Sequence, residues 1–302
     1  MRICSFLPSA TEMLYALGLG DAVQAVTYEC DYPEEVKSKR VVVRTRLPQN
    51  LSAGEIDSVV CEYMQRGESL YSVDFETLRA IQPDLIVTQD LCHVCAASPD
   101  DLATALTRLP HAPRVVSLTP KTLVGVWADL LTLGEATSRR AEAEQLVAEL
   151  KQRVENVRRA VAGAAQPRVV CLEWLDPPFV GGHWVPEMVA AAGGADALGR
   201  AGEPSFRVSG DDVLAARPEV IVVMPCGYNA QQTADEFRVT KLPEGWNALP
   251  AARNRRVFAL DANSYASRPG PRLADGVEIL AALFHPARVK APAPDGAVIP
   301  LT

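Results

Sequence analysis

Runs of apolar, β-branched residues alternate along the chain with segments of helical periodicity, and this alternation predicts buried strands joined by helices. Residues 74–87 are similar to residues 209–222: each stretch predicts a short helix with acidic residues in its first turn, a proline that ends the helix, and a buried strand. Strand-like segments at residues 2–7 and 168–173 open the two halves of the chain. The repeated order of elements predicts two related α/β lobes.

A long segment of helical periodicity separates the two halves. Residues 122–165 contain no proline, and apolar residues recur there at three- and four-residue steps from Leu123 to Val161. At about 1.5 Å per residue such a helix would span about 60 Å, and Gly134 is a candidate for a break within it. We therefore expect an N-terminal α/β lobe at residues 1–120, a bridging helix at 121–166, a C-terminal α/β lobe at 167–289 and a loose tail at 290–302.

Composition and charge narrow the class of protein. The 302 residues are 48% apolar and 22% charged, which is ordinary for a globular chain of two domains and excludes a disordered one. The net charge of −7 provides no basic field for a phosphate backbone, so we expect no nucleic-acid partner. A cationic partner or ligand suits this charge better, and we expect a monomer.

The cysteines and the N-terminal residues indicate the cellular compartment of the protein. Seven cysteines are an odd number spread through a long chain, which favours a reducing compartment over a disulfide-stapled secreted domain. Pro8 and Glu12 interrupt any apolar segment before it reaches the length of a signal peptide. As written, the chain predicts a cytoplasmic protein, and a periplasmic or extracellular one if a leader has been trimmed away.

Chemically distinctive residues gather in the segments that follow the predicted strands. In open α/β sheets, ligands bind beyond the carboxyl ends of the strands. Aromatic, histidine and arginine side chains occur there, at residues 28–33, 89–95, 173–184, 225–228 and 263–272. This placement predicts a ligand cleft formed by loops of both lobes.

Four segments together carry a resemblance to a known family: residues 2–12, residues 31–33, residues 177–179 with Gly193 and Gly194, and residues 264–272. They resemble the cobalamin-binding branch of the helical-backbone (class III) substrate-binding proteins, which serve ABC importers of cobalamin, haem and iron-siderophores. The similarity covers about Arg2 to His285. It implies two Rossmann-like lobes joined by a long backbone helix, with a cobalamin-type corrinoid held between them without catalysis. An ABC permease or a cytosolic acceptor is the implied partner.

The resemblance also implies which residues contact the ligand. A corrin ring presents a broad apolar face, which aromatic rings cover well, and a rim of amides that need hydrogen-bonding partners. By position, the family implies contacts from Tyr32 and Gln89 in the first lobe and from Phe179, Phe206, Tyr265 and Arg268 in the second. We add two candidates from the same loops, Trp174 as part of an aromatic wall and His93 as an imidazole for the cobalt.

Docking to an importer implies a second set of residues. Family members present an acidic residue on each lobe to arginines of the permease. The resemblance implies Asp100 or Asp101 on the first lobe and Asp235 or Glu236 on the second.

Two alternatives to a corrinoid carrier remain open. A haem or ferric-siderophore binder would share the fold, but an anionic ligand favours more positive charge than Arg268 and Arg207 provide. The Cys92-His93-Val94-Cys95 segment is a redox and metal pattern, although no second CxxC completes a zinc site. The chain contains no nucleophile elbow, Walker loop or HExxH motif, so we expect neither an enzyme nor a resident metal.

Overall fold

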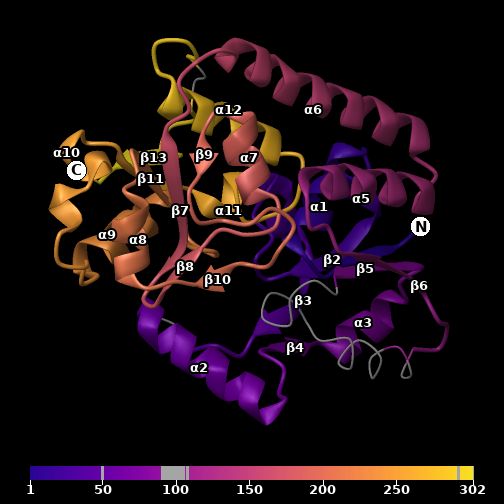
Figure 1. Ribbon diagram of the computed structural model, residues 1–302. Coiled ribbons are helices and arrows are strands. Elements are labelled where there is room, and N and C mark those ends of the chain that lie inside the picture. The colour runs from indigo at the N-terminus through magenta and orange to yellow at the C-terminus, as the bar shows by residue number, and fades with distance from the viewer. Residues whose placement is uncertain (49–50, 90–105, 107–108, 291–292, 302) are drawn as a thin grey trace. The chain divides into compact units, whose positions relative to one another are not determined.

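The computed structural model describes residues 1–48, 51–89, 106, 109–290 and 293–301. It is an α/β protein with two sheets, which confirms the predicted fold class of two lobes (Figure 1). The chain forms two compact units. Unit 1 comprises residues 1–51, 55–120 and 127–147, and unit 2 comprises residues 52–54, 121–126 and 148–302.

Unit 1 is built on a sheet whose strands follow the order β4-β3-β2-β1-β5-β6. All neighbours are parallel except β3 and β4. The strands are β1 (Ile3–Ser5), β2 (Val23–Thr27), β3 (Arg40–Thr45), β4 (Tyr71–Val73), β5 (Leu85–Gln89) and β6 (Arg114–Leu118). Among the described residues, the helices of this unit outside the central segment are α1 (Pro8–Ala16), α2 (Ala53–Arg66) and α3 (Phe75–Ile81), with 3₁₀ turns at Gly20–Ala22 and Glu34–Ser38.

Unit 2 is built on a sheet with the strand order β10-β8-β7-β11-β12-β13, and β9 pairs separately with β7. The strands are β7 (Arg168–Leu175), β8 (Pro178–Val180), β9 (Ala195–Asp196), β10 (Phe206–Arg207), β11 (Val220–Val223), β12 (Val257–Leu260) and β13 (Val298–Pro300). Figure 1 shows α7 and α12 on one side of this sheet and α8 and α9 on the other. The helices are α7 (Val185–Ala191), α8 (Gly210–Ala216), α9 (Ala230–Val239), α10 (Pro250–Arg253), α11 (Ala262–Tyr265) and α12 (Leu273–Phe284), with a 3₁₀ turn at Trp246–Ala248.

The two similar stretches fold as expected, into α3 with β5 and α8 with β11. The Asp74 carboxylate caps α3 by accepting a hydrogen bond from the Thr77 amide, and Ser209 caps α8 in a reciprocal capping box with Asp212. Both helices end at a residue in the left-handed conformation, Gln82 and Arg217, directly before the proline. Each following strand is almost wholly buried, as a continuous apolar run requires.

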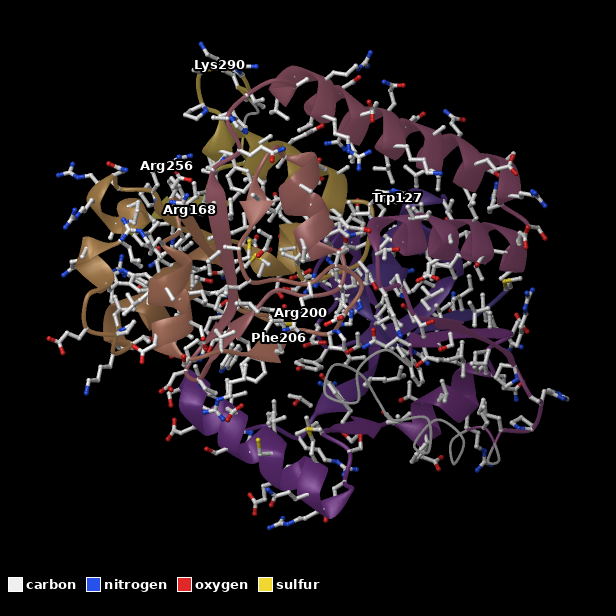
Figure 2. The ribbon with its side chains drawn as sticks, in the orientation of Figure 1. Trp127, Arg168, Arg200, Phe206, Arg256 and Lys290 are labelled. Atoms are coloured by element: carbon white, nitrogen blue, oxygen red, sulfur yellow. The ribbon has the colours of Figure 1, made fainter. Side chains whose placement is uncertain are left out.

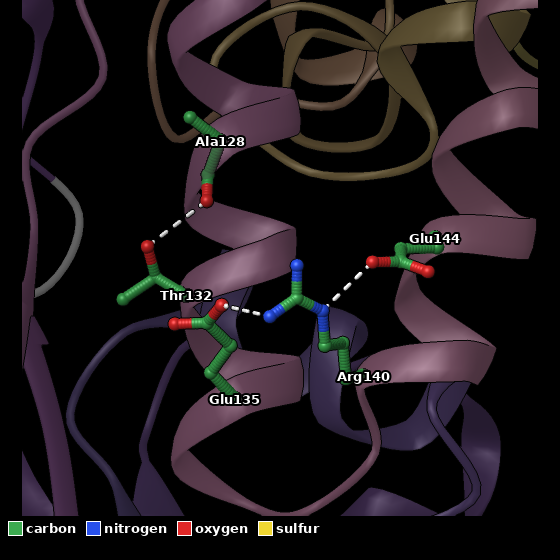
Figure 3. Close-up of polar contacts among 5 residues, drawn as sticks. All are labelled: Ala128, Thr132, Glu135, Arg140 and Glu144. Atoms are coloured by element: carbon green, nitrogen blue, oxygen red, sulfur yellow. Dashed lines mark hydrogen bonds and ion pairs between the residues drawn. The ribbon is translucent and has the colours of Figure 1, made fainter.

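The central segment differs from the single long helix that the periodicity predicts, because it divides into α5 (Leu123–Ala136) and α6 (Arg140–Val161). Ser138 has a φ of 59°, which no continuous helix permits. Gly134 makes the sharp corner sterically feasible, because a Cβ there would lie 2.5 Å from the Cβ of Ala143. Across the corner, the Arg140 guanidinium donates to Glu135 at 3.1 Å and to Glu144 at 2.8 Å (Figure 3).

The end of the chain also differs from the expected loose tail. Val298–Pro300 form β13, which pairs antiparallel with β12 and completes the edge of the unit 2 sheet. The proline lies at the end of an edge strand, where the missing N–H does not interrupt the sheet. Within the described ranges, none of the helices combines the length and the apolar character that crossing a bilayer requires.

Candidate functional site

A hairpin at the carboxyl end of β7 places an aromatic pair on one face of the unit 2 sheet. Trp174 on β7 is paired with Phe179 on β8, and Phe179 is paired with Arg207 on β10. Side chains of directly paired residues point to the same face of a sheet. The structure therefore brings together Trp174 and Phe179, two of the predicted ligand contacts, with a guanidinium beside them.

Phe206, another predicted contact, lies on the opposite face of the same sheet. It pairs with Val180 rather than Phe179, and its ring packs against the core of unit 2. The guanidinium carbon of Arg200 lies 4.6 Å from the centre of the Phe206 ring, as a cation–π contact (Figure 2). The structure thus separates Phe206 from the Trp174–Phe179 pair.

Trp174 makes specific contacts through both its ring and its indole nitrogen. The ring meets that of Tyr228 edge to face, with centroids 5.6 Å apart. Its Nε1 donates a hydrogen bond of 3.2 Å to the Ala53 carbonyl, and the Ala53 amide donates to a Glu236 carboxylate oxygen at 3.3 Å. Burial raises the pKa of Tyr228, and the charge of Glu236 raises it further. The sequence analysis identified the loop of Tyr228, which follows a buried strand, but did not name Tyr228 among the ligand contacts.

The loop after β12 carries Tyr265 and Arg268, two further predicted contacts. The Asp261 carboxylate begins α11 by accepting a hydrogen bond of 3.1 Å from the Ser264 amide, and Tyr265 ends the helix. The guanidinium carbon of Arg272 lies 6.0 Å from the centre of the Tyr265 ring. This loop therefore places a tyrosine and two arginines at the carboxyl end of β12.

Close packing holds this loop in place. Gly276 on α12 lies against the Tyr265 backbone so closely that a Cβ would come 2.0 Å from the carbonyl oxygen. The buried Trp184 indole donates a hydrogen bond of 2.7 Å to the Ala266 carbonyl. Trp184 is therefore a structural residue of unit 2, whereas Trp174 lies near the carboxyl end of β7.

The imidazole of His183, beside Trp184, contains a buried ring nitrogen. This Nδ1 has no hydrogen-bond partner in the part of the chain that the structure describes, and the His183 backbone has a φ of 51°. Burial lowers the pKa of the imidazole, and the positive charge of Lys121 lowers it further. A lowered pKa favours the neutral ring, which stacks on Trp184 with centroids 5.6 Å apart.

In unit 1, the loop after β2 presents two exposed tyrosines. Tyr32, a predicted contact, is 49% exposed, and Tyr28 is 39% exposed. The Tyr28 hydroxyl donates to the Glu29 carboxylate at 3.1 Å, and Asp31 adds a second carboxylate to the loop. Gln89, the other predicted contact in this unit, is half-buried at the last position of β5.

A buried polar cluster holds the base of this loop. The Thr11 hydroxyl donates to the Ser5 hydroxyl at 2.8 Å and lies 3.1 Å from the Cys30 sulfur. The Ser5 hydroxyl in turn donates to the Leu7 carbonyl at 3.0 Å. Residues 2–12 and the segment around residues 31–33, which carry the family resemblance, are therefore joined by this cluster.

Several predicted residues lie outside the described part of the chain: Cys92, His93, Cys95, Asp100 and Asp101. Of the two expected docking acids on α9, Asp235 is exposed and paired with Arg238, whereas Glu236 is half-buried and bonded to Ala53. No group of three or more histidine, cysteine or acidic side chains suited to a metal ion occurs among the described residues.

Residues 3–264 match the family model described as periplasmic binding protein. The chain belongs to this family. Its members are solute carriers of ABC transporters, and the helical-backbone class predicted from the sequence is confirmed.

Relatives of similar length support this assignment. The chain is 26% identical to a vitamin B12-binding protein of Vibrio cholerae over 281 residues, which cover 92% of this chain and 86% of the relative. It is also 26% identical to YvrC of Bacillus subtilis, an uncharacterized ABC transporter substrate-binding lipoprotein, over 94% of this chain and 80% of the relative.

Solved structures with the same fold are named for different ligands. The periplasmic haem-binding protein RhuT of Roseiflexus has a TM-score of 0.69 at 25% identity, with 95% of this chain and 99% of that chain covered. The periplasmic vitamin B12-binding protein BtuF of Vibrio cholerae has a TM-score of 0.68 at 24% identity, with 96% and 98% covered. The fold alone therefore does not select the ligand.

Proposed function

We propose that the protein binds a cobalamin-type corrinoid without catalysing a reaction, and that it delivers the corrinoid to an ABC permease or a cytosolic acceptor. The named relatives support this ligand, because vitamin B12-binding proteins match more than nine-tenths of the chain. The ligand contacts would come from the loops at the carboxyl ends of the strands, where open α/β sheets bind their ligands.

The observation that carries the proposal is the chemistry of the loop after β2. Tyr28 and Tyr32 expose aromatic rings there, beside the carboxylates of Glu29 and Asp31. A corrinoid offers a broad ring for the tyrosines and neutral amides that can donate to the carboxylates. The propionates of haem would be repelled by the same carboxylates.

A haem or ferric-siderophore ligand is the second candidate, and the arginines of unit 2 favour it. Arg207 lies beside Phe179, and Arg272 lies near the Tyr265 ring. An aromatic ring next to a guanidinium suits a planar ligand that carries carboxylates. The redox or metal alternative depends on Cys92, His93 and Cys95, so it is tested by replacing both cysteines with serine, which should leave corrinoid binding largely intact.

The ligand is tested by absorbance titration of the purified protein with aquocobalamin, dicyanocobinamide and haem, followed by desalting. We expect retention of a corrinoid at one equivalent and no retention of haem. A shifted visible band would assign a protein side chain to the cobalt, and an unshifted band would assign binding to stacking and amide contacts. Retention of haem with loss of both corrinoids would contradict the proposal.

A further inference from the structure

The first two residues of α2, Ala53 and Gly54, contact side chains of their own unit. Residues 52–54 belong to unit 2, and Ala53, which is 2% exposed, is the one buried residue of α2 among those described. Its amide donates to Glu236 at 3.3 Å, and its carbonyl accepts from the Trp174 indole at 3.2 Å. Gly54 lies against Asp176, because a Cβ there would be 3.3 Å from a carboxylate oxygen.

These bonds join the start of a helix to distant parts of the chain. The first N–H groups of a helix have no partner within it, so they bond to groups outside it. At α2 a carboxylate from α9, far along the chain, accepts the hydrogen bond of the Ala53 amide. The Trp174 indole, the other partner, comes from β7. Side chains from two different elements therefore bind both polar groups of a single backbone residue.

Trp174 is a candidate ligand contact, and Glu236 is linked to it through Ala53 and Tyr228. Trp174 is part of the aromatic pair on the β7–β8 hairpin, and Tyr228 connects the two, with its ring on Trp174 and its pKa raised in part by the charge of Glu236. An N–H donor next to a carboxylate acceptor is the combination that binds an amide group, which offers one carbonyl and two N–H donors. The Ala53 backbone occupies both side chains, because its carbonyl accepts from the Trp174 indole and its N–H donates to the Glu236 carboxylate.

We propose that residues 52–54 are an internal competitor at this site: they occupy Trp174 and Glu236 when no ligand is bound, and an amide of the ligand displaces them. This inference rests on the proposed function, since a corrinoid rim supplies such amides. Binding then includes the release of Ala53. The apparent affinity for the ligand therefore falls as residues 52–54 occupy Trp174 and Glu236 in a larger fraction of the molecules.

The competitor can be weakened without touching the residues that the ligand would use. Ala53→Pro removes the N–H that Glu236 accepts, and proline is well tolerated at the first position of a helix. We expect this variant to bind cobinamide about three- to ten-fold more tightly than the original chain, as the loss of one hydrogen bond to a charged group would allow. Ala53→Gly is the matched control at the same position, because it keeps the N–H that Glu236 accepts and should leave the affinity nearly unchanged.

Amide hydrogen exchange supplies the second readout. Cobinamide should speed exchange at residues 52–54 in the original chain, whereas a segment that forms part of the bound surface would exchange more slowly. Unchanged or weaker binding by a folded Ala53→Pro variant, or slower exchange with ligand, would overturn the inference and leave the proposed function standing. Failure of both proteins to bind any corrinoid would overturn the inference and the proposed function together.

Trp174→Phe should speed exchange at residues 52–54 even without ligand. Unchanged exchange in this variant would show that the indole does not hold residues 52–54.

Discussion

The Thr11 hydroxyl lies 3.1 Å from the sulfur of Cys30 and thereby joins the first helix of unit 1 to the loop after β2. Both side chains are buried, and the same hydroxyl donates to Ser5. The contact fixes the base of the loop that carries the two exposed tyrosines. The ability of unit 1 to present these rings therefore depends on a polar group in its interior.

Replacing this hydroxyl should destabilise the protein and weaken ligand binding. Thr11→Val keeps the shape but removes the hydrogen bond to Ser5 and the contact with the Cys30 sulfur, and we expect the free energy of unfolding to fall by about 1–3 kcal/mol. Urea unfolding measures the change. Thr132→Val, which removes an exposed bond to the Ala128 carbonyl within α5 (Figure 3), is the control and should cost less than about 0.5 kcal/mol. Equal losses in the two variants would refute the role of the buried cluster.

The two phenylalanines of the β8–β10 pair should behave differently. Phe179 shares a face with Trp174, so Phe179→Ala should weaken corrinoid binding about ten-fold and leave stability nearly unchanged. Phe206 packs against the core, so Phe206→Ala should cost about 1–3 kcal/mol of stability and leave the affinity nearly unchanged. Calorimetric titration and urea unfolding of both variants separate the effects. The reverse pattern would show that the opposite face of the hairpin binds the ligand.

A methyl group at residue 276 should displace the loop after β12. Gly276→Ala would place its Cβ against the Tyr265 carbonyl, and we expect at least about 2 kcal/mol of lost stability together with weaker ligand binding. Thermal unfolding and a binding titration measure the two effects. Ala282→Gly on the same helix is the control, since it loses about 1 kcal/mol of helix propensity without a clash. If Gly276→Ala were no worse than the control, the loop would not be packed as the structure shows.

Asp129 on α5 should make stability depend on pH. Burial raises the pKa of its carboxyl to about 7, and one of its oxygens is buried with no partner among the described residues. The unfolded chain ionises near the ordinary pKa of about 4, so the stability contributed by this group is complete below that pH and is lost as the pH rises toward 7.

Asp129→Asn should therefore be more stable than the original chain at pH 8, and the difference should shrink toward pH 5. Urea unfolding at both values measures the change. Asp21→Asn, at an exposed position in the same unit, is the control and should show no such dependence. A difference between Asp129→Asn and the original chain that stays constant with pH would contradict a raised pKa at Asp129.

The elements that the sequence predicts best are those whose pattern is local. Leu85–Gln89 and Val220–Val223 are continuous apolar runs after a proline, so their strands and the repeat that contains them are visible without tertiary information. The strand ends indicated the loops, and the ligand contacts within them stay a prediction. The structure pairs Trp174 with Phe179 on neighbouring strands. It also places Tyr265 and Arg268 in one loop after β12.

The features that the sequence did not predict depend on contacts between distant residues. Gly134 is a candidate for a break in the central helix, but the left-handed residue at Ser138 and the close approach of Gly134 to Ala143 are not visible in the pattern. Val298–Pro300 become a strand because β12 offers them an edge. The face on which Phe206 lies depends on its register with Val180, and a two-residue strand carries no periodicity from which to read it.

Corrinoid binding is tested most directly by calorimetric titration of the unliganded protein with cobalamin, and with haem in a parallel titration. We expect saturable heat at one equivalent of cobalamin and none with haem. Saturable heat with haem and none with cobalamin would contradict corrinoid binding.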